Sequence, residues 1–443
     1  MSGPSPGPRT LRPLAGVLAA TGLSLTGTRI SVVALPWFVL VTTGSATQTG
    51  LVAFCEMAPY VLVKALIGPL VDRSGPRIVS WSTDALSAAA ALTIPALHTA
   101  GRLSFWLLLL LVAVIGAARA PGDLAKEVMV PEAADRGMVA LERATGLSGV
   151  MERLAFTIGP AAGGSLVALL GPMTALVVNA LCFGTGSVVI ALVVPRSVGR
   201  TAEAPGRGPD APGYWRRLGE GVLFLRRDPL LLTVTAMIAV TNLLDAAFTS
   251  VLVPVWAKES GNGPAAIGLT GTASGLAAVA GSLVAAGVAH RLKRRVVFFA
   301  GFLLAGAPRF LILAADDVPL WAVAAVFAVG GFGAGFLNPI LGAVLYERIP
   351  RQLLGRVKGL GTSLAWVGIP LGGLLAGAAV SSFGLVPSLL AGGVAYFLTT
   401  NLAGLRREWR QMDQSRGKRA AKEEKKEEEK KEEVSRPSDH AMP

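Results

Sequence analysis

The sequence predicts an all-α integral membrane protein with twelve transmembrane helices in two pseudo-symmetric six-helix halves. Of its 443 residues, 52% are hydrophobic and only 16% are charged, whereas soluble domains carry about 25% charged residues. A chain of this length has room for about a dozen helices of about 20 apolar residues each. The 41 lysines and arginines lie in short clusters between long apolar runs. This pattern argues against a soluble enzyme and against a nucleic-acid partner.

Twelve apolar runs are predicted to cross the bilayer, with ends uncertain by a few residues. They cover about 14–40, 49–71, 78–98, 104–122, 144–170, 174–195, 229–256, 266–289, 296–315, 319–346, 359–381 and 386–405. No small-residue cleavage site follows the first run, which is therefore predicted to be a helix and not a signal peptide. The predicted domains are a cytoplasmic N-terminus 1–13, an N-terminal half 14–195, a cytoplasmic central loop 196–228, a C-terminal half 229–405 and a charged tail 406–443.

The distribution of basic residues predicts the orientation. Most lysines and arginines lie on one side of the predicted topology, a few lie within the spans, and Arg102 and Lys258 lie on the other side. Because cytoplasmic loops carry the excess of basic residues, both termini are predicted to be cytoplasmic in a plasma-membrane protein. The segment 214–227 is predicted to be an amphipathic helix in the membrane interface or an ordinary connector. The tail at 422–433 is predicted to be a charged helix or disordered.

The two halves look like duplicated units. Sliding the chain against itself aligns Pro36 with Pro254 and Arg77 with Arg295. A parallel repeat of six-span halves places a cavity between them at the bilayer midplane, as alternating access requires. Asp72 aligns with His290, so only one half keeps the acid. We therefore expect the loop that contains Asp72 to do more than set the orientation.

The loop between the second and third spans carries a family resemblance. It reads GPLVDRSGPR at 68–77 and resembles the signature loop of the major facilitator superfamily, Gly-x-Leu-x-Asp-Arg-x-Gly-x-Arg. The resemblance implies a latch for the outward-facing state, formed by Gly68, Asp72, Arg73, Gly75 and Arg77. Asp84, near the cytoplasmic end of the third span, is predicted to join this network. A purely anchoring loop accounts for the arginines but leaves Asp72 unexplained.

The fifth span carries a second resemblance. It reads GPAAGG at 159–164, similar to the antiporter signature of drug and proton exporters in the same superfamily, although Ala155 replaces the glycine that usually opens it. The matching residues are Gly159, Pro160, Gly163 and Gly164. On the residues alone, the segment predicts a bent helix that packs closely on a neighbour. The direction of transport, export, is implied by the resemblance.

Further segments resemble the branch that contains macrolide efflux proteins and the enterobactin exporter. They read VALPW at 33–37, LRRDP at 225–229 and LGRV at 354–357. Two segments depart from the family pattern. Span one has Gly27-Thr28-Arg29 where a Gly-Asp pair is common, and 119–122 matches the arginine motif of span four poorly. The family's coupling chemistry is therefore not carried over intact.

Ionisable residues inside spans cost about 2.5–3.5 kcal/mol at the centre, so each is a candidate for function. Glu56, Tyr60 and Lys64 recur every four residues and share one face of span two, which is predicted to line the cavity. Glu56 is predicted to exchange a proton or contact substrate, or else to form a structural ion pair with Lys64 or Arg29.

Span seven holds Asn242 and Asp245 on adjacent turns. Asp245 is predicted to couple protons or contact substrate, paired with Arg29 across the cavity, or else to make a buried hydrogen bond between helices. Glu152 and Arg153 point about 100° apart, so one is predicted to line the cavity while the other pairs sideways with Asp84 or Arg119. Arg309 is left without a role, since it can snorkel outward.

The leading hypothesis is a monomeric secondary exporter of a small amphipathic molecule, such as a drug, antibiotic or siderophore, driven by proton antiport. Uptake by symport or by facilitated diffusion is the alternative. Cys55, Cys182 and the three histidines have no metal-ligand spacing, and no phosphate loop is found, so neither metal nor cofactor is predicted. A membrane-embedded enzyme lacks a catalytic constellation, and a non-transporting sensor remains a third class. The substrate itself is not specified by the sequence.

Overall fold

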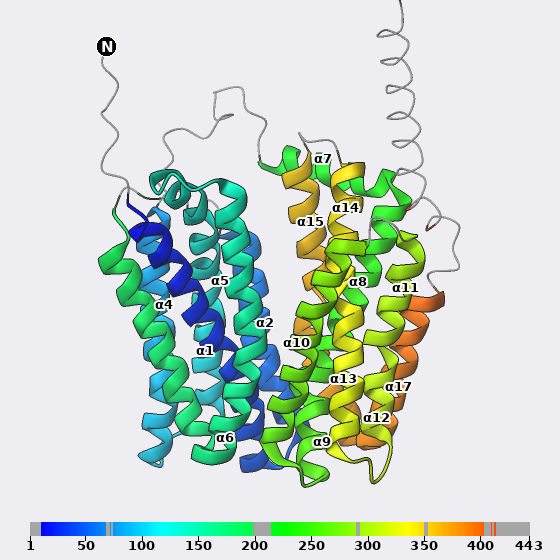
Figure 1. The fold of residues 1–443 in the computed structure, drawn as a ribbon. Coiled ribbons are helices and arrows are strands. Elements are labelled where there is room, and N and C mark those ends of the chain that lie inside the picture. Colours follow the sequence, from blue (N-terminus) through cyan, green and yellow to red (C-terminus); the bar gives the residue numbers. More distant parts are fainter. Residues whose placement is uncertain are drawn as a thin grey trace, which may run out of the picture.

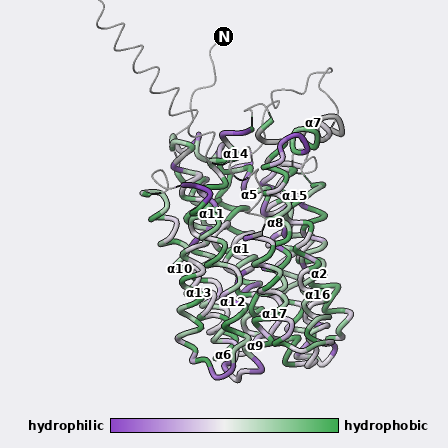
Figure 2. Tube along the Cα trace, turned by 90° about the vertical axis from the view of Figure 1, so that its right-hand side faces the viewer, coloured by the Kyte–Doolittle hydropathy of each residue, from purple (hydrophilic) through white to green (hydrophobic). Residues whose placement is uncertain are grey.

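The computed structural model describes residues 10–67, 71, 74–196, 198, 214–288, 293–349, 353–402, 409 and 412. These residues form helices and short connections, arranged as two bundles side by side (Figure 1). We call the end of the molecule that carries the helix at 214–227 the α7 end, and the opposite end the α9 end. Hydrophobic residues follow the helices along the bundle in Figure 2. This is the arrangement expected of a protein whose surface faces lipid.

Among the described residues, the N-terminal bundle contains five long helices that make six crossings. They are α1 (Arg12–Thr43), α2 (Ala46–Leu66), α4 (Pro76–Thr99), α5 (Phe105–Arg136) and α6 (Leu141–Val193). The backbone of α6 leaves the helical conformation at Gly171 (φ 81°, ψ 163°), a combination that favours glycine. The chain reverses there, so that Val193 returns to the α7 end and packs against Gly16 of α1. The predicted spans five and six are therefore both present.

The C-terminal bundle is built from shorter helical pieces. They are α7 (Tyr214–Arg227), α8 (Pro229–Ala247), the π-helix η1 (Phe248–Leu252), α9 (Val253–Glu259), α10 (Gly263–Val288), α11 (Arg294–Ala305), α12 (Ala307–Ala314), α13 (Leu320–Gly335), α14 (Leu337–Arg348), α15 (Leu354–Trp366), α16 (Ile369–Phe383), α17 (Leu385–Phe397) and the π-helix η2 (Leu398–Leu402). Several pieces join end to end into single crossings. The break between α11 and α12 falls at Gly306, where a side chain would overlap the ring of Tyr396.

Together these elements make twelve crossings, as predicted. Nine helices in the described parts of the chain are long and apolar enough to cross a membrane. One of them, α6, crosses twice, and α4 and the α17–η2 segment complete the set. The predicted end of span four at 122 is wrong as a helix end, because α5 continues to Arg136 with Pro121 and Pro131 inside it.

Polar residues mark where several helices begin. The side chain of Ser45 accepts a hydrogen bond from the backbone N–H of Gln48 at the start of α2. Asp228 does the same for Leu230 and Leu231 at the start of α8, and Arg348 holds the other side of this carboxylate at 2.8 Å. Such caps satisfy N–H groups that a helix leaves free at its first turn.

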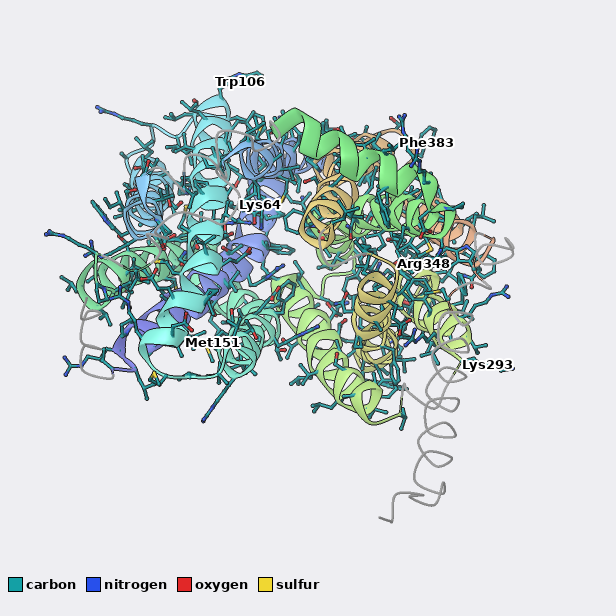
Figure 3. All side chains as sticks on the ribbon, turned by 90° about the horizontal axis from the view of Figure 1, so that it is seen from above. Lys64, Trp106, Met151, Lys293, Arg348 and Phe383 are labelled. Carbon is teal, nitrogen blue, oxygen red and sulfur yellow. The ribbon has the colours of Figure 1, made fainter. Side chains whose placement is uncertain are left out.

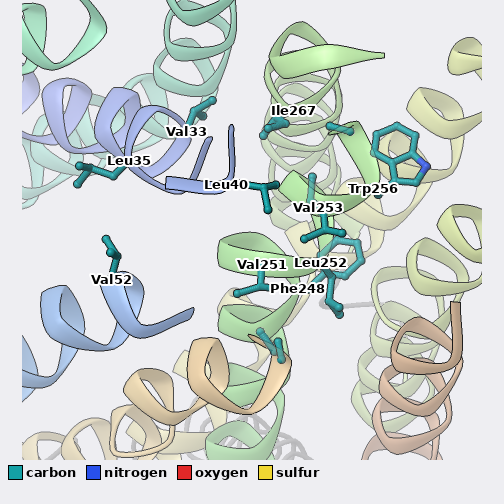
Figure 4. Close-up of a cluster of buried hydrophobic side chains, with 14 of the residues drawn as sticks. Val33, Leu35, Leu40, Val52, Phe248, Val251, Leu252, Val253, Trp256 and Ile267 are labelled. Atoms are coloured by element: carbon teal, nitrogen blue, oxygen red, sulfur yellow. The ribbon is translucent and has the colours of Figure 1, made fainter. Parts of the chain in front are cut away.

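The two bundles meet at the α9 end. Apolar side chains of α1, α2, η1, α9 and α10 gather there in one buried cluster (Figure 4). Lys258 of α9 also crosses between the bundles and donates a hydrogen bond to the backbone oxygen of Leu40 at 3.0 Å. This end is therefore closed by side chains from both halves.

Candidate functional site

A cavity of about 1110 Å³ lies between the two bundles. Its walls come from α1, α2, α5 and α6 on one side and from α8, η1, α15 and α16 on the other. It reaches toward the α7 end, where the Glu127 side chain on its wall is 66% exposed. Figure 3, seen from the α7 end, shows Lys64 beside the space between the halves. The cavity thus opens at the α7 end and stops above the closed α9 end.

The structure brings all seven predicted cavity residues to this one cavity. They are Arg29, Glu56, Tyr60, Lys64, Glu152, Asn242 and Asp245. Glu56, Tyr60 and Lys64 were predicted to share one face of α2. In the structure, that face borders the cavity. Glu152 is exposed toward the cavity, and Asn242 donates a hydrogen bond to the backbone oxygen of Ala365 on α15 at 3.0 Å.

The charges of the cavity wall are distributed unequally. The N-terminal half supplies eight charged lining residues, Arg29, Glu56, Lys64, Arg119, Asp123, Lys126, Glu127 and Glu152. Among the described lining residues of the C-terminal half, Asp245 is the one charged side chain. The remaining C-terminal wall carries small, hydroxyl and apolar side chains, together with Trp366.

Three residues of α2 face three residues of α5 at the same four-residue spacing. They are Glu56, Tyr60 and Lys64 opposite Arg119, Asp123 and Glu127. At the first step, Arg119 donates to Glu56 at 2.9 Å, and both side chains are only 9% exposed. Because a buried charge is stable only with a partner, this pair fixes α2 against α5. Lys64 or Arg29 was the predicted ion-pair partner of Glu56. In the structure, that partner is Arg119 instead.

The other two contacts between α2 and α5, which lie nearer the α7 end, are longer than the first. The Tyr60 hydroxyl donates to Asp123 at 3.2 Å, and the Lys64 ammonium lies 3.7 Å from Glu127. Sequence reasoning found the α2 face but missed the α5 face, because Pro121 and Gly122 followed by charged residues resemble a helix end. The matching four-residue spacing on α5 is the signal that identifies it.

The C-terminal half has its own carboxylate–guanidinium pair. Asp245 is bound by Arg309 of α12, and the guanidinium lies 4.7 Å from the ring of Phe248, 5.3 Å from Phe310 and 5.2 Å from Tyr396. Aromatic faces attract a cation, so the rings hold Arg309 beneath Asp245. The predicted pairing of Asp245 with Arg29 is wrong, and Arg309 points inward and does not snorkel.

Arg29 takes a different position. Its guanidinium lies 3.4 Å from the centre of the Phe156 ring on α6, and its Cβ packs where Gly159 leaves room. It therefore joins α1 to α6 within the N-terminal half, in place of the predicted link across the cavity.

A second buried ion pair joins Lys126 of the cavity wall to α4. Lys126 of α5 reaches Asp84 of α4 at 2.8 Å, with side chains 2% and 0% exposed, and it also donates to Ser24 of α1 at 3.0 Å. The predicted sideways partners of Glu152 or Arg153 are therefore both otherwise engaged, Asp84 by Lys126 and Arg119 by Glu56. Lys126 was missed because it was assigned to a loop.

Comparison with known proteins decides the family. The family model of the Major Facilitator Superfamily matches residues 17–244 and 235–438. The chain belongs to the major facilitator superfamily. It is therefore a multi-pass membrane transporter of the superfamily whose fold has two six-helix halves.

Relatives within the superfamily include drug exporters. The chain is 33% identical to the multidrug efflux pump Tap of Mycobacterium tuberculosis over 378 residues, which cover 85% of this chain and 88% of that protein. It is 22% identical to macrolide efflux protein A of Streptococcus pyogenes over 409 residues, which cover 90% and 96%. The predicted resemblance to the macrolide-efflux branch is confirmed.

Solved structures of the superfamily share the fold. The chain is similar to the nucleoside transporter NupG, with a TM-score of 0.69 and 12% identity over 89% of this chain and 98% of that one. It is also similar to a bacterial homologue of the lysosomal transporter Spinster in an inward-facing, unoccupied conformation. That TM-score is 0.68, with 14% identity over 92% and 99% of the chains.

Part of the superfamily's signature loop can be located. Gly68, Asp72 and Arg73 lie outside the described residues. Gly75 precedes α4 with φ 84°, which favours glycine. Arg77 donates hydrogen bonds to the backbone oxygens of Val194, at 2.6 Å, and Ala191. Arg77 therefore ties α4 to the end of α6 within the same half.

The antiporter-type motif lies on α6 where this helix touches both halves. Gly163 faces α1, and a Cβ there would lie 3.1 Å from the Cα of Ile30. Gly164 faces α10 of the other half, where a Cβ would lie 2.7 Å from the Cα of Gly268. Pro160 packs on the same helix beside Gly271. The small residues thus allow two backbones from different halves to touch.

A matching contact joins α2 to α16. A side chain on Gly50 would overlap the backbone oxygen of Gly373, and one on Gly377 would lie 2.7 Å from the backbone oxygen of Ala46. Thr47 and Ser381 hydrogen bond at 2.7 Å beside them. The α6–α10 and α2–α16 contacts, here called the glycine seals, close the α9 half of the cavity.

Replacing Gly50 with valine is expected to prevent closure at the α9 end, because the overlap is with backbone and cannot be relieved by a rotamer. Overpacking costs about 1–3 kcal/mol, which shifts a two-state population by about 5- to 150-fold. Transport measured in vesicles should fall accordingly. Gly149→Val is the matched control, since no atom lies within 4 Å of a Cβ there. Equal transport by both variants would contradict a seal at Gly50.

Proposed function

We propose that this transporter exports small amphipathic molecules, of the drug, antibiotic or siderophore class, by proton antiport with alternating access. The observation that carries the proposal is that one cavity between the halves is lined by a carboxylate from each half, and that each carboxylate is held by an arginine of its own half. Glu56–Arg119 comes from the N-terminal half and Asp245–Arg309 from the C-terminal half. Apolar and aromatic neighbours such as Met57 and Phe156 suit the apolar part of such a substrate.

The buried pair supplies a physical route to coupling. While Glu56 is ionised, it holds Arg119 by a charge-assisted hydrogen bond. A proton on this carboxylate removes the charge and leaves Asp123, at 3.9 Å, as the acidic neighbour of Arg119 among the described residues. Proton binding therefore changes the pair that fixes α2 against α5 on the cavity wall, and a ligand can shift an equilibrium only through such a difference between states.

The two acids suit different tasks. The Glu56 side chain is 9% exposed, whereas that of Asp245 is 39% exposed toward the cavity. We assign the proton to Glu56, because a shielded carboxylate exchanges a proton more readily than it meets a bulky molecule. We assign substrate contact to Asp245, which Arg309 and its aromatic rings hold in place from behind.

Export and orientation rest on separate support. The names of the drug-exporting relatives favour export, and the excess of Lys and Arg supports a cytoplasmic α7 end. The cavity then opens to the cytoplasm, from which a drug is taken up. We further propose that Asp72, Arg73 and Arg77 latch the outward-facing state, and that one chain suffices for transport.

The test uses inside-out membrane vesicles acidified within and a pH-sensitive dye. Macrolides, siderophores and amphipathic dyes are added in turn, and export predicts that one of them releases lumenal protons. Asp245→Asn is expected to abolish the release, whereas Glu259→Gln, an exposed acid at the α9 end, should retain it. Movement of labelled compound without proton release would replace antiport by facilitated diffusion, and proton flow in the same direction as the compound by symport.

A further inference from the structure

An aromatic pair inside the cavity joins the two halves. The rings of Tyr60 on α2 and Trp366 on α15 stack with centres 6.1 Å apart and planes at 24°. The Lys64 ammonium lies 4.8 Å from the centre of the Trp366 ring and 5.6 Å from that of Tyr60. All three residues line the cavity. A cation from one half therefore rests on an aromatic surface that both halves build.

Lys64 is held loosely there. Its acidic neighbour, Glu127, lies at 3.7 Å and is 66% exposed, and exposed ion pairs contribute about 0–1 kcal/mol. Its hydrogen bond to the Tyr60 hydroxyl is long, at 3.4 Å. By contrast, Arg119 and Lys126 hold their acids at 2.9 and 2.8 Å with side chains almost fully buried. Lys64 can therefore leave the ring without breaking a buried pair.

We propose that Lys64 is a tethered competitor that occupies the cation site on Tyr60 and Trp366, and that an aromatic organic cation displaces it. The proposal rests on the proposed function and names the substrate class for its cavity. A substrate cation takes the place of the ammonium on the ring face, where cation–π attraction is strongest. The freed ammonium stays near the carboxylates of Asp123 and Glu127 on α5, so its charge keeps acidic neighbours.

Displacement also removes a contact between the halves, because Lys64 belongs to one half and Trp366 to the other. A bound cation then replaces the Lys64–Trp366 contact with its own contacts to the two rings. Neutral molecules do not compete with the ammonium for the ring in the same way. Lys64 therefore sets how strongly the cavity prefers positively charged aromatic molecules over neutral ones.

Two fluorescent probes test the proposal on the full-length protein in lipid nanodiscs. Ethidium is an aromatic monovalent cation, and N-phenyl-1-naphthylamine is a neutral aromatic amphipath. Lys64→Gln is expected to lower the Kd for ethidium about five- to tenfold, as loss of a cation–π competitor predicts, and to leave the neutral probe's Kd within about twofold. Lys64→Arg, which keeps a cation over the ring, is the control and should bind ethidium as the unmodified protein does.

Trp366→Leu completes the design. It should weaken ethidium binding and abolish the gain caused by Lys64→Gln in the double variant. Unchanged or weaker ethidium binding by Lys64→Gln would overturn the proposal, as would an equal gain for both probes. Proton release by unmodified vesicles, measured alongside, separates the failures. If protons are released but Lys64→Gln does not change ethidium binding, only the proposal for Lys64 fails. If neither probe binds and no compound releases protons, the proposed function fails as well.

Discussion

Replacing Lys126 with methionine is expected to destabilise the protein by about 3–5 kcal/mol, because it leaves the Asp84 carboxylate charged and without its cation in the interior of the N-terminal half. The pair is 2.8 Å long, and its side chains are 2% and 0% exposed. Ser24 also bonds to both partners but carries no charge to replace the ammonium. The thermal unfolding midpoint in detergent and the yield of monodisperse protein measure the effect.

Removing both charges should cost less than removing one. Lys126→Met combined with Asp84→Asn leaves no unpaired ion, so a large part of the loss should return. Arg102→Gln is the control, since this arginine is exposed at the α9 end and exposed charges contribute about 0–1 kcal/mol. If Lys126→Met were as stable as this control, the buried pair would not hold α4 to α5.

Glu56→Gln is expected to reduce proton-coupled export by about 100-fold or more, the size of effect that a positioned proton-transfer group has on a rate. The amide keeps the shape of the side chain and a hydrogen-bonding oxygen for Arg119, but it cannot take up the proton. Exchange of labelled for unlabelled substrate across the membrane needs no net proton movement. It should therefore continue while proton release stops.

Two further variants guard this interpretation. Glu56→Asp keeps an ionisable group near Arg119 and should recover part of the proton release. Glu259→Gln changes an exposed acid far from the cavity and should behave as the unmodified protein. If Glu56→Gln exports against a gradient at the normal rate, the proton is carried elsewhere, and Asp245 becomes the candidate.

The fold was largely predictable, because each crossing needs about 20 apolar residues and is separated from the next by charged or turn-forming residues. The reversal at Gly171 illustrates this. Glycine and proline at 171–172 interrupted one long apolar segment, and the structure places the turn there. The four-residue spacing of Glu56, Tyr60 and Lys64 likewise predicted a shared face, which depends on helix geometry alone.

Pairings between helices were not predictable in the same way. Arg309 reaches Asp245 because the helix breaks at Gly306 and three aromatic rings surround the guanidinium. None of these distances is encoded in local periodicity. Lys126 was misplaced for a related reason, since a buried lysine is affordable only beside an acid that comes from another helix. Ion pairs inside a membrane protein therefore require the tertiary structure.

The unequal charge of the cavity wall has a consequence for how the range of substrates evolves. The network of ion pairs around the cavity lies almost entirely on the N-terminal side, while α15, α16 and the residues between them contribute Thr362, Ser363, Val367 and Ile369. Substitutions at these four positions alter the shape and polarity of the wall without removing an ionised group. Under the proposed function, one half can thus diversify under selection by new substrates while the other preserves the residues to which we assign proton coupling.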